Sequence, residues 1–193
     1  MNNDGSSTTL TRRRWLASAA VTGAAALAGV PPAARAADKF ALRYITASSM
    51  YGNLPLAEVL AEVRKAGADS VDLWPKPHGT QREEAGALGD DALDALLDRH
   101  GVKLGMLTRY DFGALGIQKE IPFARRHGAK VLITGVGGPV GLAGDELKKA
   151  VADFVEKLKP AVEAAAEAGL VLGIENHAKS LIESPDSMRR LAE

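Results

Sequence analysis

The fold of this chain is decided by the stretch LVLGIENH at residues 170–177. It follows a long segment with helical apolar spacing, and a short apolar run in that place predicts a buried strand. Because side chains alternate along a strand, Leu172 and Ile174 point one way while Glu175 and His177 point the other. The stretch therefore predicts a strand whose apolar face packs on helices and whose opposite face becomes polar where the strand ends.

The same pattern occurs four times earlier in the chain. A helix commonly ends at a residue in the left-handed backbone conformation, which glycine adopts easily. Such a glycine precedes four of the predicted strands: Gly67, Gly101, Gly128 and Gly169. The predicted strands cover 40–45, 70–74, 102–107, 130–134 and 170–175, and the predicted helices cover 56–66, 90–99, 114–126, 145–168 and 186–193. Alternating strands and helices are typical of α/β proteins with parallel strands.

Three helix details also follow from residue types. We expect Asp90 or Asp91 to cap the second helix, and Ser184 to cap the last one with proline at its first position. We expect distortions at Pro122 in the third helix and at Pro160 in the fourth.

Two architectures fit this alternation: a (β/α)8 barrel and an open doubly wound sheet. The phosphate-binding pattern G-x-G-x-x-G, usual after the first strand of a doubly wound sheet, is missing at 47–52, and the glycine-rich turn at 135–141 has other spacing. Polar residues at the carboxyl ends of the strands favour the barrel, whose active sites lie at that end. Five strand–helix units fill residues 37–193, whereas the eight units of a complete barrel need about 250 residues. We therefore expect a partial barrel, truncated after the fifth unit.

The first 36 residues differ from the rest. Arginines at 12–14 precede an uncharged stretch from Trp15 to Ala34, and Ala34-Arg35-Ala36 has the small residues of a cleavage site. A membrane anchor is the alternative, but the stretch is rich in alanine, glycine, serine and threonine and weakly hydrophobic. The segment resembles a twin-arginine export signal, which predicts a periplasmic protein that meets the membrane only during export.

Composition narrows the classes further. The 193 residues contain no cysteine, which excludes disulfides and cysteine-ligated metal sites. The formal net charge is zero, but four arginines face only Asp4 in 1–36, so residues 37–193 hold 20 basic and 23 acidic residues. This mildly acidic segment gives no support for a nucleic-acid-binding protein.

Glu175 is the strongest candidate for a catalytic or metal-binding residue. A carboxylate that ends an apolar strand is expected to be poorly solvated, so it needs a cation, a hydrogen-bond network or a raised pKa. From residue spacing alone, two interpretations of the Glu175 carboxylate are equally good: it binds a divalent metal, or it accepts hydrogen bonds from neighbouring polar groups without a metal.

The other candidates lie near the ends of the predicted strands. Asp72 faces inward by strand parity, and Trp74 either stacks on a sugar ring or fills the top of the barrel. The remaining positions on this end are His78, Asn176, His177 and, as weaker substrate contacts, Arg109 and Tyr110. His100 and His127 directly precede helix-ending glycines, which predicts structural roles.

These residues carry a family resemblance. LGIENH at 172–177 with Ser-Pro-Asp at 184–186 resembles the fifth strand and following helix of xylose-isomerase-like TIM barrels, the sugar phosphate isomerase/epimerase family. AGADSVDLW at 66–74 resembles their second unit, with Asp72 where many members have glutamate. The resemblance covers about 40–193.

The resemblance implies roles for several residues. Glu175 is implied to be catalytic and a ligand of a divalent metal (Mn, Mg, Co or Zn), with Trp74, His78, Asn176 and His177 on the substrate side. The family's other ligands, an Asp, a His and a Glu, come from later strands that would lie beyond Glu193. In the family, a metal polarises a sugar carbonyl while carboxylates move protons beside it.

The predicted function is therefore a metal-dependent sugar or sugar phosphate isomerase/epimerase with a small-molecule sugar as its partner. Two alternatives remain: an inactive or sugar-binding truncated barrel, and an apurinic-site endonuclease, which would need more histidines on early strands and a basic groove. A five-stranded sheet has two open edges, and we expect them to allow self-association.

Overall fold

A computed structural model describes residues 42–193 of the chain. Its sheet has five parallel strands in the order β1-β2-β3-β4-β5, so each strand pairs with the next one along the chain. The strands are β1 (Ile45–Ala47), β2 (Ser70–Leu73), β3 (Lys103–Thr108), β4 (Val131–Gly135) and β5 (Val171–Glu175). This sequential parallel order is the order of strands in a (β/α)8 barrel, which confirms the predicted fold class.

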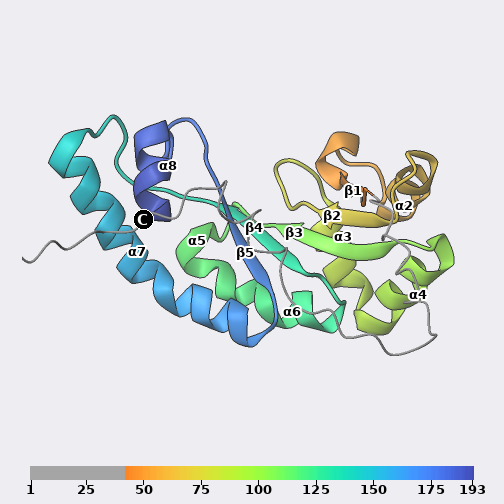
Figure 1. The fold of residues 1–193 in the computed structure, drawn as a ribbon. Helices are drawn as coiled ribbons and strands as arrows, with labels where there is room; N and C mark the ends of the chain where they lie inside the picture. Colours follow the sequence, from red (N-terminus) through yellow and green to blue (C-terminus); the bar gives the residue numbers. More distant parts are fainter. Residues whose placement is uncertain (1–41) are drawn as a thin grey trace, which may run out of the picture. The chain divides into compact units, whose positions relative to one another are not determined.

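Helices connect the strands and close each unit. They are η1 (Ser48–Tyr51), α2 (Leu56–Lys65), α3 (Gln81–Leu88), α4 (Asp90–His100), α5 (Gly113–Gly116), η2 (Ile117–Glu120), α6 (Ile121–Arg126), α7 (Gly144–Glu167) and α8 (Pro185–Ala192). Figure 1 shows α4, α6 and α7 on one side of the strands. Because parallel strands require crossover connections, each connection carries at least one of these helices.

The structure differs from the sequence-based prediction in the first two units. Strand β1 begins at Ile45, so residues 42–44 of the strand predicted at 40–45 are not in a strand, and residues 40 and 41 lie outside the described residues. Helix α3 was not predicted, because its first turn is polar and its apolar positions are few. Neither Asp90 nor Asp91 caps α4: Gly89 holds the cap position at φ 80°, and both carboxylates lie in the first turn, where they favour the positive end of the helix dipole.

The predictions for the later helices are closer. The third helical run is broken into α5, η2 and α6, and Pro122 lies in the first turn of α6, where its missing N–H leaves no helical hydrogen bond unmade. Helix α7 continues through Pro160. Ser184 caps α8 by accepting a hydrogen bond from the Ser187 N–H at 3.1 Å, and Pro185 follows at the first helical position, as predicted.

The two faces of the sheet differ in how they are packed. Val71, Leu107 and Leu132 are completely buried and belong to one apolar core with residues of α2, α4 and α7. On the opposite face two strand glycines make room for isoleucines: a Cβ on Gly105 would lie 3.2 Å from the Ile45 side chain, and a Cβ on Gly173 would collide with Ile133. The strands therefore direct large apolar side chains toward the helices, whereas glycines replace some of the side chains on the opposite face.

No helix among residues 42–193 is long and apolar enough to cross a membrane. The predicted export signal at 1–36 lies outside the described residues.

Candidate functional site

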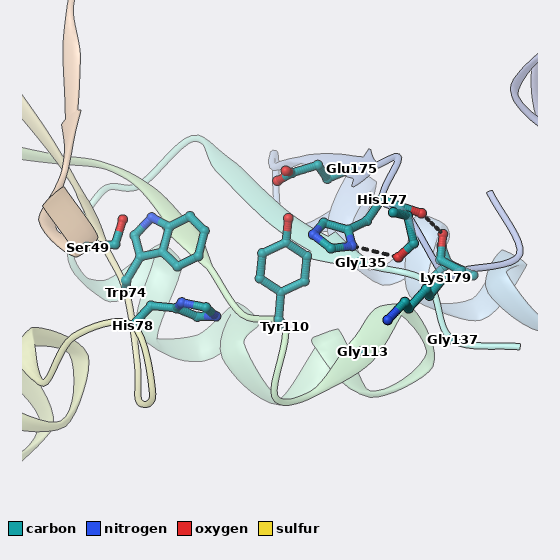
Figure 2. Close-up of a pocket in the computed structure, with 13 residues that line it drawn as sticks. Ser49, Trp74, His78, Tyr110, Gly113, Gly135, Gly137, Glu175, His177 and Lys179 are labelled. Atoms are coloured by element: carbon teal, nitrogen blue, oxygen red, sulfur yellow. Dashed lines mark hydrogen bonds between the residues drawn. The ribbon is translucent and has the colours of Figure 1, made fainter. Parts of the chain in front are cut away.

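A pocket of about 670 Å³ lies at the carboxyl ends of the strands (Figure 2). Its lining comes from η1 and from the loops after β2, β3, β4 and β5, with residues Ser49, Trp74, His78, Tyr110, Gly113, Gly135, Val136, Gly137, Glu175, His177, Ala178, Lys179 and Ser180. In parallel α/β barrels this end carries the reactive groups. The fold therefore brings five sequence-predicted residues into one pocket: Trp74, His78, Tyr110, Glu175 and His177.

Asp72 organises the β2 side of this pocket. Its Oδ2 accepts hydrogen bonds from the indole N–H of Trp74 and the hydroxyl of Thr108, both at 2.7 Å, while its Oδ1 is buried without a partner among the described residues. Burial, the largest cause, raises the pKa of Asp72 to about 6. Ser48 completes the arrangement because its hydroxyl accepts a hydrogen bond from the Trp74 backbone N–H at 2.9 Å. Asp72 thus faces inward, as strand parity predicted, and its contacts fix the plane of Trp74.

Four rings form a row along the pocket (Figure 2). The ring centroid of Trp74 lies 5.4 Å from that of His78 and 5.6 Å from that of Tyr110, and Tyr110 lies 6.4 Å from His177. Aromatic faces offer apolar contact area, and imidazole nitrogens add donors and acceptors. Such a row suits a ligand with both C–H faces and hydroxyl groups.

Tyr110 stands at the centre of the row because Gly135 leaves space for its ring. A Cβ on Gly135 would lie 2.6 Å from two ring carbons of Tyr110. The phenol oxygen points toward Glu175 (Figure 2). Burial, followed by the neighbouring Glu175, raises the pKa of Tyr110 above its usual value. The phenol therefore keeps its proton and remains a hydrogen-bond donor at neutral pH.

Glu175 is exposed, contrary to the expectation of a poorly solvated carboxylate. The reason is its position: β5 forms the edge of the described sheet, so only β4 flanks it. Among the described residues no group of three or more histidines, aspartates or glutamates is arranged to hold a metal ion. Glu175 is the one carboxylate among the described residues that line the pocket.

The structure separates the remaining candidates. His177 is exposed, and its Nδ1 lies 2.8 Å from the carbonyl oxygen of Ala178. Asn176, between Glu175 and His177, is exposed and does not line the pocket. His127 is structural as predicted: its side chain is fully enclosed, with Nδ1 2.7 Å from Asp94 of α4.

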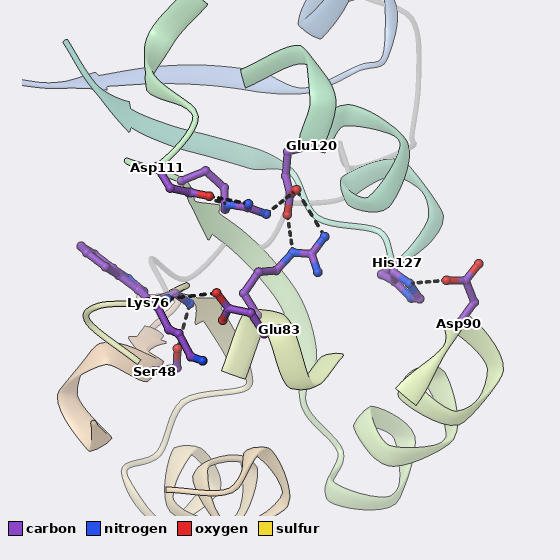
Figure 3. Close-up of polar contacts among 10 residues, drawn as sticks. Ser48, Lys76, Glu83, Asp90, Asp111, Glu120 and His127 are labelled. Carbon is purple, nitrogen blue, oxygen red and sulfur yellow. Dashed lines mark hydrogen bonds and ion pairs between the residues drawn. The ribbon is translucent and has the colours of Figure 1, made fainter. Parts of the chain in front are cut away.

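Arg109 does not reach the pocket but takes part in a buried ion network (Figure 3). Its Nη1 donates to Glu120 at 2.6 Å, and its Nε and Nη2 donate to the two oxygens of Asp111 at 2.8 and 2.7 Å. Arg82 of α3 donates to both oxygens of the same Glu120, which is 2% exposed. The network is further covered by Phe112, stacked on the Arg109 guanidinium at 3.8 Å. Arg109 was expected to contact substrate, and instead it anchors the loop after β3.

Sequence reasoning missed several pocket residues, among them Ser49 and Lys179. Lys179 has φ 61°, a conformation that is unusual for a residue with a side chain, and its backbone N–H donates to Glu183 at 2.9 Å. Glu183 also accepts from the Gly141 N–H at 3.0 Å, so it joins the loops after β4 and β5. No sequence motif signals this arrangement, because it depends on contacts between two separate loops.

The fold and the pocket together define a class of protein: an α/β barrel type with its candidate site at the carboxyl ends of parallel strands. The model of the xylose isomerase-like TIM barrel family matches residues 60–193, and the chain belongs to this family. No curated protein sequence matches the chain.

Solved structures share the fold at low sequence identity. A xylose isomerase-like TIM barrel protein from Mycobacterium smegmatis in complex with magnesium is 18% identical with a TM-score of 0.54, and the match covers 77% of this chain and 60% of that one. The 3-keto-D-glucoside 4-epimerase YcjR from E. coli is 15% identical with a TM-score of 0.56, over 78% and 63% of the two chains. An AP endonuclease, family 2, from Brucella melitensis is 16% identical with a TM-score of 0.54, over 78% and 65%. The chain thus spans about three fifths of the length of these structures.

Proposed function

We propose that this chain contributes the sugar-binding half of a metal-dependent isomerase/epimerase site. The observation that carries the proposal is the pocket in which Glu175 lies beside the row of Trp74, Tyr110, His78 and His177. The rings provide faces for the C–H side of a sugar, and the carboxylate provides a proton acceptor. A sugar epimerase is among the fold relatives, and the 20 basic and 23 acidic residues of 37–193 give no support for a nucleic-acid substrate.

In this proposal Glu175 removes a proton from the carbon beside a sugar carbonyl and returns it to the substrate. A divalent metal, as in the magnesium complex of one fold relative, would polarise that carbonyl when bound. Of the described residues, Glu175 is the one we propose as its ligand. Trp74, His78 and His177 line the pocket in which the substrate would lie.

Two measurements test the proposal. The first is titration of the purified chain with Mn²⁺, followed by the paramagnetic signal of the free ion. Glu175→Gln is expected to lower Mn²⁺ affinity at least tenfold, whereas Glu167→Gln, an exposed glutamate at the end of α7, is expected to leave it unchanged. Equal affinities in the two variants would reject Glu175 as a ligand.

The second measurement follows proton transfer itself. Erythrulose, a four-carbon ketose too short to close into a furanose or pyranose ring, is incubated with the chain and Mg²⁺ in D₂O. We expect deuterium to appear at the carbons beside the carbonyl, measured by proton NMR, and to appear much more slowly with Glu175→Gln. Binding without exchange would favour the alternative of a sugar-binding barrel without activity.

We also propose that residues 1–36 export the protein to the periplasm by the twin-arginine route. The support is the run Arg12-Arg13-Arg14 before an uncharged stretch that ends in Ala34-Arg35-Ala36. Replacing the three arginines by lysine is expected to retain the chain in the cytoplasm, as measured by cell fractionation. Unchanged fractionation would reject this route.

A further inference from the structure

Tyr110 is a pocket residue whose ring is held by neighbours on several sides. Its ring lies between Trp74 and His177, and its hydroxyl points toward Glu175 (Figure 2). We propose that Tyr110 donates a hydrogen bond to the carbonyl oxygen of the substrate while Glu175 moves the proton. This inference rests on the proposed function and adds to it the group that stabilises the developing charge.

The chemistry is assisted by such a donor, which would act on the same oxygen as the proposed metal. When Glu175 takes a proton from the carbon beside the carbonyl, the electron pair of the broken C–H bond forms a C=C bond. The π pair of the carbonyl then moves onto its oxygen, which becomes negative. When Glu175 returns the proton to the carbon that lost it, the C=C π pair forms the new C–H bond and a lone pair of the oxygen re-forms the carbonyl. A preorganised donor that faces this oxygen lowers the barrier, and removal of one such donor typically slows a reaction 100- to 1000-fold. Tyr110 has the required position beside Glu175, and its phenol hydroxyl is a hydrogen-bond donor.

Two features hold the phenol in place independently of any ligand. On one side, the absence of a side chain at Gly135 allows the ring to lie directly against the β4 backbone. On the other, the neighbours of Tyr110 in the chain are tied down: Arg109 binds both Glu120 and Asp111, and its carbonyl accepts from the Thr134 hydroxyl at 3.1 Å. A ring that only filled space would not need a polar group aimed into the pocket. The buried network thus makes Arg109 and Glu120 positioning residues for Tyr110.

The experiment compares Tyr110→Phe with Tyr51→Phe, the same change at a partly buried tyrosine outside the pocket. Erythrulose and erythritol are the probes, because they differ in having or lacking the carbonyl. Affinities are measured by saturation-transfer NMR with Mg²⁺ present, and proton transfer is measured by deuterium uptake. Tyr110→Phe is expected to slow uptake about 100-fold and to weaken erythrulose binding about fivefold, with less than a twofold effect on erythritol. Tyr51→Phe is expected to change none of these values.

Gly135→Ala provides a second variant in which the hydroxyl is kept but displaced. The added methyl group must push the ring aside, so deuterium uptake is expected to fall as in Tyr110→Phe. In the double variant Gly135→Ala with Tyr110→Leu, the smaller side chain relieves the collision. Thermal stability is therefore expected to recover relative to Gly135→Ala, while uptake stays low.

The outcomes separate this inference from the proposed function. If the unchanged chain neither binds erythrulose nor exchanges deuterium, the proposed function fails and this inference fails with it. If the unchanged chain exchanges deuterium and Tyr110→Phe does so within twofold, only the role of Tyr110 is overturned. A loss of erythritol and erythrulose affinity in equal measure would also overturn it, because a ring contact would then explain the effect without the hydroxyl.

Discussion

Glu120 and Glu175 are two carboxylates in opposite environments. Glu120 is 2% exposed and is bound by Arg82 and Arg109, whereas Glu175 is exposed at the edge of the described sheet. Glu120 joins the second and third βα units, and Glu175 faces the pocket. The difference indicates that the chain uses its buried ion network to hold the loop after β3, and leaves the β5 carboxylate available for a ligand.

Removal of Glu120 tests the buried side of this comparison and has the largest expected effect. Glu120→Ala leaves Arg82 and Arg109 without their shared partner in a buried position, which is expected to lower the free energy of unfolding by about 3–5 kcal/mol. Urea denaturation followed by circular dichroism measures the loss. A loss near that of an ordinary surface substitution would contradict the assignment of this network as a structural anchor.

The second prediction concerns Asp72, which is buried like Glu120 but has no cationic partner within residues 42–193. Its pKa is raised from 3.8 to about 6, so the folded chain holds this proton more tightly than the unfolded chain does. The resulting stability is complete below about pH 4 and is lost as the pH rises through 6, for a total of about 2–3 kcal/mol.

Asp72→Asn removes this pH dependence and keeps an oxygen for Trp74 and Thr108. Relative to the unchanged chain, the variant is expected to gain about 2–3 kcal/mol between pH 4 and pH 8 in urea denaturation. Asp69→Asn, an exposed aspartate in the turn before β2, serves as the control. A stability difference that stays constant with pH would contradict the prediction.

The third prediction concerns Glu175, the exposed carboxylate of the comparison. Glu175→Gln is expected to change the free energy of unfolding by no more than about 0.5 kcal/mol, because the side chain is exposed. The same variant is expected to lose Mn²⁺ affinity, so function and stability separate at this position. A destabilisation as large as that of Glu120→Ala would show that both carboxylates are structural.

The smallest effect is expected at a surface ion pair. Lys149 and Asp153 lie one turn apart on α7 with 2.6 Å between Nζ and Oδ2, and both side chains are mostly exposed. Water screens such pairs, so Lys149→Ala is expected to leave the thermal unfolding midpoint unchanged within the precision of calorimetry. A measurable drop would show that distance alone, without burial, accounts for the strength of the Glu120 network.

Local patterns were sufficient for much of the fold and for part of the site. The strand at 170–175, the helix-ending glycines and the Ser184 cap depend on near neighbours in the chain, and the structure confirms them. The inward direction of Asp72 follows from strand alternation alone. The Arg82–Glu120 pair spans 38 positions, and the Gly135–Tyr110 contact joins two strand ends, so neither has a local signal.

The sequence by itself determined the five strands and their order along the chain, the family and the end of the barrel at which the candidate residues gather. It did so because strand alternation and helix periodicity are local physical constraints. The tertiary structure decided which of two adjacent residues serves the pocket: Arg109 turns into the buried network and Tyr110 faces Glu175. The physical reason is desolvation, since a buried guanidinium must find carboxylates, and Glu120 and Asp111 meet Arg109 only when the units are packed together.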